Sequence, residues 1–223
     1  MNDPNHHLEK GRPMPKKIYL MRHGKSTWNE IQKTSGQTDP PLAPKGLALA
    51  ERLAKVLVNE PLTAIYSSTL KRSIETARPT ADCHGLPIHQ ERDLQEQNLG
   101  DLEGRYRDER DPEAEELWAK RTENRVRFVP PNGETYAALE ERVGGCLNNI
   151  LRDEAGGEIL IVGHRITNRV LMQALLDLSA ADAEQLSLRS KFLYEIAPGK
   201  EPMVHTILLS EHKAGKRHEG LMT

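Results

Sequence analysis

An arginine and a histidine stand side by side directly after a short apolar segment near the start of the chain. Residues 18–21 are apolar, and Arg22, His23 and Gly24 follow them. A neutral imidazole nitrogen can accept a phosphoryl group, and an arginine beside it offers a planar fork of donors to phosphate oxygens. These residue types suit the binding and attack of a phosphate. A histidine that merely ends a strand is an equally strong interpretation of these residues alone.

A nucleotide-binding loop is a second interpretation of the same stretch, because Gly24-Lys25-Ser26 reproduces the last three residues of that motif. The motif also requires a glycine five positions before Gly24, so that successive backbone N–H groups can wrap the phosphates. Tyr19 occupies that position. The spacing therefore excludes the nucleotide loop.

Further polar residues follow three later segments of the chain. They are Ser67 and Ser68 with Arg72 one turn further on, then Glu96, then His164. Ligands of open α/β sheets bind at the carboxyl ends of strands, so we expect these residues to meet Arg22 and His23 in one crevice. Two histidines, two arginines and one carboxylate form a cationic pocket with a single acid. That is the electrostatic requirement of phosphoryl transfer without a metal.

Strand-like and helix-like segments alternate along the chain, which predicts an α/β fold of three layers, with a mostly parallel central sheet and helices on both faces. Apolar periodicity carries this prediction. We expect strands at 17–21, 63–66 and 158–162, with a later pair at 192–196 and 203–209 at a sheet edge, and helices at 47–58, 70–79, 136–150 and 168–176.

One domain over residues 1–223 is expected, with a polar N-terminal tail at 1–15 and a charged insertion at 104–130 over the active site. Within the insertion, 104–127 is dense in charge and weak in periodicity. It could gate a substrate, or it could be a solvated charged face without that role.

The bulk composition limits the classes of molecule that the protein is expected to bind. The 31 basic and 33 acidic residues nearly balance, so the charge favours a small soluble substrate and neither nucleic acid nor a membrane surface. Cys83 and Cys146 are too few for a disulfide scaffold or a four-cysteine zinc site, and we expect both to be buried. No segment has the length of a transmembrane helix or the pattern of a signal peptide. We predict a cytoplasmic protein with no cofactor and no metal, whose oligomeric state is open, a homodimer being possible.

Taken together, the motifs resemble the histidine phosphatase superfamily, which includes the cofactor-dependent phosphoglycerate mutases. The matches occur in family order from Met21 to about Leu176, most of the chain. They are Arg22-His23-Gly24 with Asn29; Ser35-Gly36 with Asp39-Pro40-Pro41-Leu42 and Gly46; Tyr66-Ser67-Ser68-Thr69-Leu70-Lys71-Arg72 with Glu75-Thr76-Ala77; Leu94-Gln95-Glu96 with Gly100 and Glu103-Gly104; and Val162-Gly163-His164.

The resemblance implies a role for each matched residue. His23 would be the nucleophile, and Arg22, Arg72 and His164 would neutralise the phosphate oxygens. Glu96 would protonate the leaving alkoxide and then activate water, so its acid form must stay populated near neutral pH. Substrate binding would also involve Asn29, Ser35 and Gly36. Three neighbouring acids compete with Glu96 for its role: Glu91, Asp101 and Glu103.

The sequence departs from the family pattern at three places, the first of which concerns stability and not function. Ala43 replaces the usual threonine or serine before the first helix, which removes an N-cap worth about 1 kcal/mol. Arg165 stands where glycine is common after the second histidine. If its side chain enters the crevice, an anionic or doubly phosphorylated leaving group fits. Gln97-Asn98-Leu99 replaces the Arg-His-Tyr of typical mutases.

That last replacement removes groups that would hold a carboxylate. It therefore favours a phosphatase over a phosphoglycerate mutase, the second hypothesis. A catalytically silent binding domain of the same fold is the third.

Overall fold

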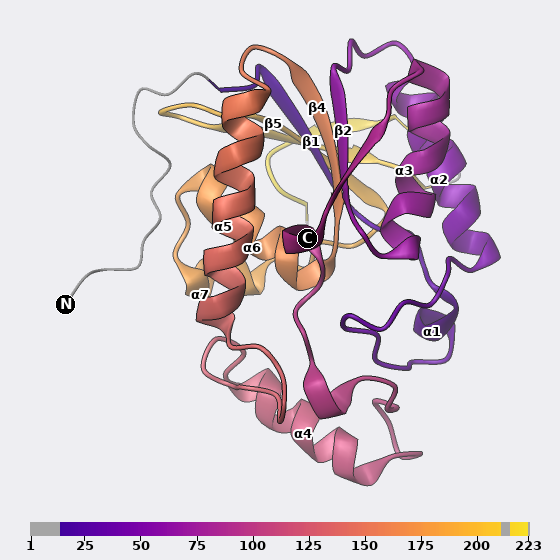
Figure 1. Ribbon diagram of the computed structural model, residues 1–223, viewed down its shortest axis with the longest axis vertical. Coiled ribbons are helices and arrows are strands. Elements are labelled where there is room, and N and C mark those ends of the chain that lie inside the picture. Colours follow the sequence, from indigo (N-terminus) through magenta and orange to yellow (C-terminus); the bar gives the residue numbers. More distant parts are fainter. Residues whose placement is uncertain (1–13, 211–214, 223) are drawn as a thin grey trace.

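The computed structural model describes residues 14–210 and 215–222, and a seven-stranded sheet runs through them (Figure 1). The order across the sheet is β3, β2, β4, β1, β5, β6, β7. The strands are β1 (Lys17–Arg22), β2 (Ala64–Ser68), β3 (Ile88–Glu91), β4 (Glu158–Gly163), β5 (Phe192–Ala197), β6 (Met203–Leu208) and β7 (Arg217–Glu219). Of the predicted tail at 1–15, residues 1–13 lie outside the described residues.

The sheet has a parallel half and an antiparallel half. Strands β3, β2, β4 and β1 pair in parallel, whereas β5 pairs antiparallel with β1, and β6 and β7 continue antiparallel. The α/β fold class is confirmed, and the sheet is mixed. The predicted late pair is present as β5 and β6, with the short β7 beyond it.

Helices cover both faces of the sheet, as predicted (Figure 1). Alternate residues of β1 serve the two layers: Ile18 and Leu20 belong to the core under α5 and α6, whereas Tyr19 and Met21 belong to the core under α2 and α3. This alternation follows from the two-residue period of a strand. The helices are α1 (Thr27–Glu30), α2 (Pro44–Leu57), α3 (Lys71–His84), α4 (Pro112–Glu123), α5 (Tyr136–Asp153), α6 (Arg165–Leu176) and α7 (Ala180–Gln185).

The charged segment contains α4, a helix that its weak periodicity does not predict. Asp111 caps this helix by accepting the Ala114 N–H, and Pro112 occupies the first helical position. Ala114 is fully buried, and Trp118 packs against the core under α5 and α6. In Figure 1, α4 lies at one end of the molecule, beyond the ends of the sheet strands.

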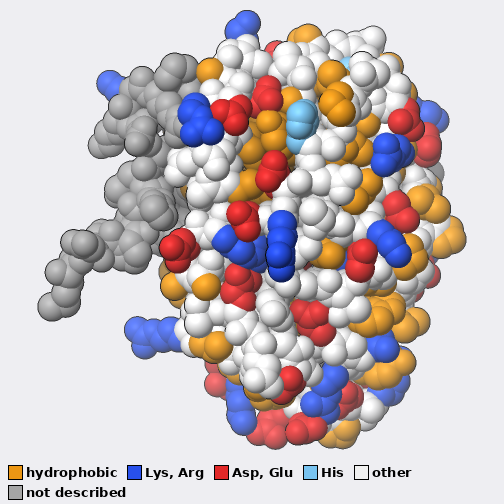
Figure 2. All heavy atoms as spheres, viewed as in Figure 1, with side chains coloured by type: hydrophobic (Ala, Val, Ile, Leu, Met, Phe, Trp, Pro, Cys, Tyr) orange, Lys and Arg blue, Asp and Glu red, His pale blue; other side chains and the backbone are white. Residues whose placement is uncertain are grey.

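The surface charge and the burial of the cysteines can also be compared with the expectations from the sequence. Acidic and basic side chains are mixed over the face seen in Figure 2, without an area of one sign. Cys146 is buried on α5, as predicted, but Cys83 is exposed, because it lies on the face of α3 opposite the buried Ala77 and Ala81. Within 14–210 and 215–222, no helix combines the length and the apolar composition needed to cross a membrane.

Candidate active site

Two histidines follow neighbouring parallel strands at the same level of the sheet. The register between β1 and β4 pairs Arg22 with Gly163, so the next residues, His23 and His164, lie side by side. The His23 N–H donates to the Gly163 carbonyl at 3.0 Å, and the centroids of the two imidazole rings are 5.0 Å apart. The strand register alone thus brings together two residues separated by most of the chain.

His23 holds a defined tautomer. Its Nδ1 lies 2.6 Å from the Gly24 carbonyl, which can only accept, so Nδ1 carries the proton. Its Nε2 receives the Arg72 Nε–H at 3.3 Å and is therefore the unprotonated nitrogen. Burial, with Arg72 and Arg22 beside the ring, lowers the pKa of His23 well below 6.5. A neutral imidazole with its lone pair on Nε2 results.

Gly24 is required by close packing between two backbone segments. A Cβ at this position would lie 2.8 Å from the Gly46 carbonyl oxygen and 2.9 Å from Gly46 Cα. Lys25 is exposed, and the Ser26 hydroxyl accepts the Asn29 N–H as the cap of α1. These positions agree with the exclusion of a nucleotide loop.

Arg72 is almost completely buried at the start of α3, with 1% of its surface exposed. Its Nη1 donates to the Thr38 carbonyl at 2.8 Å and its Nη2 to the Gly36 carbonyl at 2.6 Å. The loop that supplies these carbonyls is itself held by Glu103, which accepts the Gln37 and Thr38 N–H groups at 2.8 Å. Glu103 therefore has a structural task in the loop.

His164 precedes α6 and is fully buried. Its Nε2 lies 2.7 Å from the Ser68 hydroxyl, while its Nδ1 is buried without a partner among the described residues. Burial, and then Arg72, lowers the pKa of His164 well below 6.5. Nδ1 is thus the nitrogen left for a ligand, and Ser68 fixes the ring, a role that the motif alone does not reveal.

Glu96 binds the N-terminus of α6. Its carboxylate accepts the Arg165 N–H at 3.0 Å, the Ile166 N–H at 3.1 Å and the Thr167 N–H at 3.2 Å. The first N–H groups of a helix have no partner within the helix, so a carboxylate is well placed there. Glu96 is the only carboxylate among the described residues that line the pocket containing His23. Glu91, Asp101 and Glu103 do not line it.

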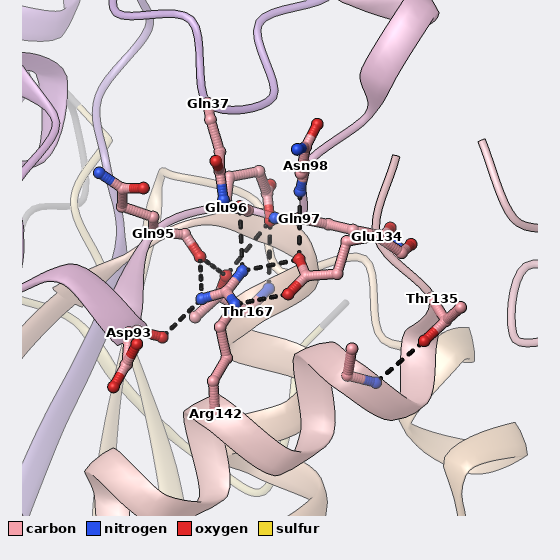
Figure 3. Close-up of polar contacts among 11 residues, drawn as sticks. Gln37, Asp93, Gln95, Glu96, Gln97, Asn98, Glu134, Thr135, Arg142 and Thr167 are labelled. Atoms are coloured by element: carbon pink, nitrogen blue, oxygen red, sulfur yellow. Dashed lines mark hydrogen bonds and ion pairs between the residues drawn. The ribbon is translucent and has the colours of Figure 1, made fainter. Parts of the chain in front are cut away.

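Arg142 from α5 holds the backbone around Glu96 (Figure 3). Its guanidinium donates to the carbonyls of Asp93 at 2.6 Å, Gln95 at 3.0 Å and Glu96 at 3.1 Å. Its charge is balanced by Glu134, at 2.6 Å. A helix residue that satisfies three carbonyls of an irregular segment fixes the course of that segment. No local motif marks Arg142 in the sequence.

All the predicted site residues surround one crevice. Its volume is about 190 Å³, and every predicted site residue but one lines it. The exception is His164, whose ring lies against that of His23.

Asn29 uses its side-chain oxygen to accept the Ser26 N–H, which leaves its amide NH₂ for a ligand. Among the predicted site residues, the buried polar atoms without a described partner are Arg22 Nε, Ser35 Oγ, His164 Nδ1 and Arg165 Nε. The lining includes Arg22, His23, Asn29, Ser35, Gly36, Arg72, Glu96 and Arg165.

Four arginines that the motifs do not indicate also line this pocket: Arg107, Arg121 and Arg125 from the charged segment and Arg169 from α6. The segment is tied to the loop before Ser35, because the Thr34 N–H donates to the Arg105 carbonyl and the Gly104 N–H donates to the Thr34 carbonyl, both at 2.9 Å. In the sequence, the charge density of 104–127 is the only signal for Arg107, Arg121 and Arg125, and no signal marks Arg169. Among the described residues, no group of three or more His, Cys, Asp or Glu side chains is arranged as a metal site.

Comparison with known proteins gives consistent matches. The family model for the histidine phosphatase superfamily (branch 1) matches residues 18–203. The probable phosphoglycerate mutase GpmB of Yersinia pestis (strain Pestoides F) is 35% identical over 186 residues, which are 83% of this chain and 86% of the relative.

Solved structures agree on the fold. The alpha-ribazole phosphatase from Shigella flexneri superimposes with a TM-score of 0.76 at 24% identity, covering 93% of this chain and 100% of that one. The mycobacterial glucosyl-3-phosphoglycerate phosphatase Rv2419c gives a TM-score of 0.72 at 21% identity, covering 93% and 98%.

Proposed function

Because the chain belongs to the histidine phosphatase superfamily, we propose that it is a metal-independent phosphomonoesterase that hydrolyses a small phosphorylated metabolite through a phosphohistidine. One observation carries this proposal. The unprotonated Nε2 of the buried His23 lies in a pocket beside the Arg72 guanidinium, at 3.3 Å, and beside His164. A nitrogen nucleophile and the cations that receive phosphate oxygens are thus assembled before a substrate binds.

The first step transfers the phosphoryl group to the enzyme. His23 Nε2 attacks the phosphorus in line with the leaving oxygen, a P–N bond forms and the ester P–O bond breaks. In the transition state the negative charge spreads over the three equatorial oxygens of the phosphoryl group. These oxygens accept hydrogen bonds from Arg22, Arg72 and His164 Nδ1–H. The carbonyl of Gly24 keeps the proton of His23 on Nδ1, so the imidazole stays oriented through the transfer.

Glu96 serves both steps as the acid and then the base. It gives its proton to the departing alkoxide, and the resulting carboxylate takes a proton from the water that attacks the phosphohistidine. A P–O bond forms, the P–N bond breaks, and neutral His23 and inorganic phosphate are released. In the free protein Glu96 accepts every described hydrogen bond that it makes, all from N–H and O–H donors. The first step therefore requires that this carboxylate carry a proton when the substrate is bound.

A panel of phosphate monoesters assayed with and without a chelator tests the proposal, with His23→Ala as the control. We expect phosphate release that the chelator does not reduce and that the alanine variant lacks. Trapping of one phosphoryl group on His23 after an alkaline quench identifies the intermediate. Turnover that a chelator abolishes, or an alanine variant with full activity, would contradict the mechanism.

A phosphoglycerate mutase is the second candidate, favoured by the 35% identity to the probable mutase GpmB. In the sequence, Gln97-Asn98-Leu99 lacks the groups that would bind the carboxylate of a mutase substrate. This argument against a mutase is weaker in the structure, because other arginines line the pocket. Incubation with a phosphoglycerate and its bisphosphate separates the two activities. Mutase turnover that exceeds phosphate release would reject the phosphatase.

A catalytically silent domain is the third alternative, and a purified protein that releases no phosphate from any ester of the panel would support it. The cytoplasm remains our prediction for the compartment, on the cysteine count, and a homodimer remains one possible state.

A further inference from the structure

The pocket that contains His23 carries more positive charge than one phosphate group requires. Among the described residues, seven arginines line the pocket together with one carboxylate, that of Glu96. Arg22 and Arg72 lie at the phosphate end with His23. Two others are neutralised from behind by Glu184 of α7, which lies 2.9 Å from Arg169 and 3.7 Å from Arg125.

Three arginines remain without an ion pair among the described residues: Arg107, Arg121 and Arg165, called the distal arginines below. Arg107 donates its Nε–H to the Thr34 hydroxyl at 3.1 Å and stacks on the Trp118 ring, 4.3 Å from its centroid. Arg121 donates to the Gln97 side-chain oxygen at 2.8 Å. These neutral partners orient the guanidinium groups without balancing their charge.

Donor groups of two distal arginines are buried and unused. Arg121 is only 3% exposed, yet its Nε and Nη1 have no described partner, and neither has Arg165 Nε. An unsatisfied buried donor destabilises a fold, and more so when the group is charged. Donors left in this state along a pocket wall indicate an anionic ligand that completes their hydrogen bonds.

The number of charges distinguishes between anions. Three guanidinium groups that line one pocket without an ion pair match the two charges and three oxygens of a phosphate better than the single charge of a carboxylate. The lining of the pocket also includes Leu99, Trp118 and Ile166, which suit carbon atoms. Ligand pockets are typically about 300–1,000 Å³, so this smaller one fits a short carbon chain.

We propose that the preferred substrate is a small bisphosphate, a phosphate monoester whose leaving alcohol carries a second phosphate group held by Arg107, Arg121 and Arg165. This inference rests on the proposed function. The ester bond next to His23 breaks, the alcohol oxygen takes its proton from Glu96, and the product alcohol keeps the second phosphate. Gln97 and Thr34 act as positioning residues for this site.

Three esters on one carbon chain test the proposal. They are propane-1,3-diol monophosphate, the phosphate ester of 3-hydroxypropanoate, and propane-1,3-diol bisphosphate, so that only the distal group changes from hydroxyl to carboxylate to phosphate. We expect kcat/KM for the bisphosphate, corrected for its two equivalent phosphates, to exceed that of the hydroxyl ester about 100-fold. The carboxylate ester should fall between them.

Variants assign the preference to the distal arginines. Arg107→Met and Arg165→Met should each reduce the ratio of bisphosphate to hydroxyl-ester kcat/KM about tenfold. Arg127→Met is the matched control, because Arg127 is exposed in the same charged segment and does not line the pocket. It should leave the ratio unchanged. Calorimetric titration of His23→Ala with the bisphosphate measures the same preference as a Kd, without turnover.

The outcomes separate this inference from the proposed function. If the wild type hydrolyses the hydroxyl ester and the bisphosphate within about threefold of each other, the inference is wrong and the phosphatase stands. Equal rates for the carboxylate ester and the bisphosphate would also overturn it, because a single charge then suffices. If neither these esters nor the wider panel releases phosphate, the proposed function itself fails.

Discussion

Arg72, at the phosphate end of the pocket, and Arg121, at its distal end, are equally buried but differently satisfied. Arg72 donates to two backbone carbonyls of a loop as well as to His23, whereas Arg121 donates one hydrogen bond to Gln97 and leaves its Nε and Nη1 without a described partner. Arg72 is thus fixed before any ligand arrives. Arg121 is completed only when an anion binds.

This difference follows from the elements that carry the two arginines. The phosphate end is built at the ends of β1, β2 and β4, whose register fixes the positions of His23 and His164. The distal end is built largely from the charged segment, which contacts the sheet domain through Thr34. We therefore expect changes at the phosphate end to affect every substrate, and changes at the distal end to affect the choice among substrates.

Arg72→Met should give the largest effect. Loss of a preorganised donor to the transition state lowers kcat by about 10²–10³, and Arg72 also holds the loop at Gly36, so we expect a loss of about 10³ in kcat/KM. Steady-state kinetics on the hydroxyl ester, the carboxylate ester and the bisphosphate measure this loss of kcat/KM. Arg78→Met, an exposed arginine of the same helix, is the control. A loss confined to the bisphosphate would show that the two ends are not divided as argued.

Glu96→Gln should lower kcat/KM by about 10² for alkyl phosphates, because the leaving alkoxide needs a proton in the first step. An aryl phosphate whose phenol is acidic should lose much less kcat/KM, because this parameter does not include the hydrolysis of the phosphohistidine, in which Glu96 is the base. The measurement is therefore the dependence of log kcat/KM on the pKa of the leaving group. Glu91→Gln is the matched control, since Glu91 does not line the pocket.

Arg142→Met, combined with Glu96→Gln, tests whether Glu96 acts in catalysis or only binds the N-terminus of α6. Besides its ion pair with Glu134, Arg142 contacts the carbonyls of the segment 93–96, so Arg142→Met should cost little further activity when Glu96 is already Gln. If Glu96 serves only to bind the N-terminus of α6, then Glu96→Gln would lower the thermal stability and would slow alkyl and aryl esters equally.

The pH dependence of stability should also come from the phosphate end. The pKa of His164 is lowered in the fold, so below about pH 6.5 the unfolded chain binds a proton that the folded chain does not. Stability is therefore fully present above that pH and is lost as the pH falls. His164→Gln should reduce the slope of the unfolding free energy by about 1.4 kcal/mol per pH unit between about pH 5 and 6.5.

Urea unfolding at a series of pH values measures this slope. His89→Gln, whose ring is exposed, is the control. An unchanged slope in His164→Gln would mean that this ring is not held neutral in the fold. The distal arginines stay charged throughout this range and contribute no such slope.

The sequence predicts the phosphate end better than the distal end for a physical reason. His23, Arg72 and His164 follow apolar segments whose periodicity identifies strands, and strand ends converge at one edge of a sheet. Their roles remain predictions, but their convergence could be expected. Ser68 lies within a predicted motif, yet only the distance to His164 Nε2 gives it a task.

Arg107, Arg121 and Arg142 could not be predicted in this way, because tertiary partners decide where each points. Arg121 is directed by Gln97, a residue that had suggested only a missing carboxylate site. The helix α4 had a usable signal, since Asp111-Pro112 combines an N-cap residue with a first-turn proline. The dense charge around it obscured the periodicity.

Thr34→Val should give the smallest effect and should confine it to the distal end. The Thr34 hydroxyl accepts from Arg107 Nε at 3.1 Å and from Trp118 Nε1 at 3.2 Å, and valine keeps the shape of threonine without that acceptor. The two donors lose their common partner, so we expect a loss of about 1–2 kcal/mol in unfolding free energy.

Because Arg107 is then less well oriented, the ratio of bisphosphate to hydroxyl-ester kcat/KM should fall about threefold. Thr34→Ser keeps the hydroxyl and is the matched control, in which the ratio should recover. An equal loss on all three esters would show that the charged segment positions the phosphate end as well, and the division between the two ends would then have to be abandoned.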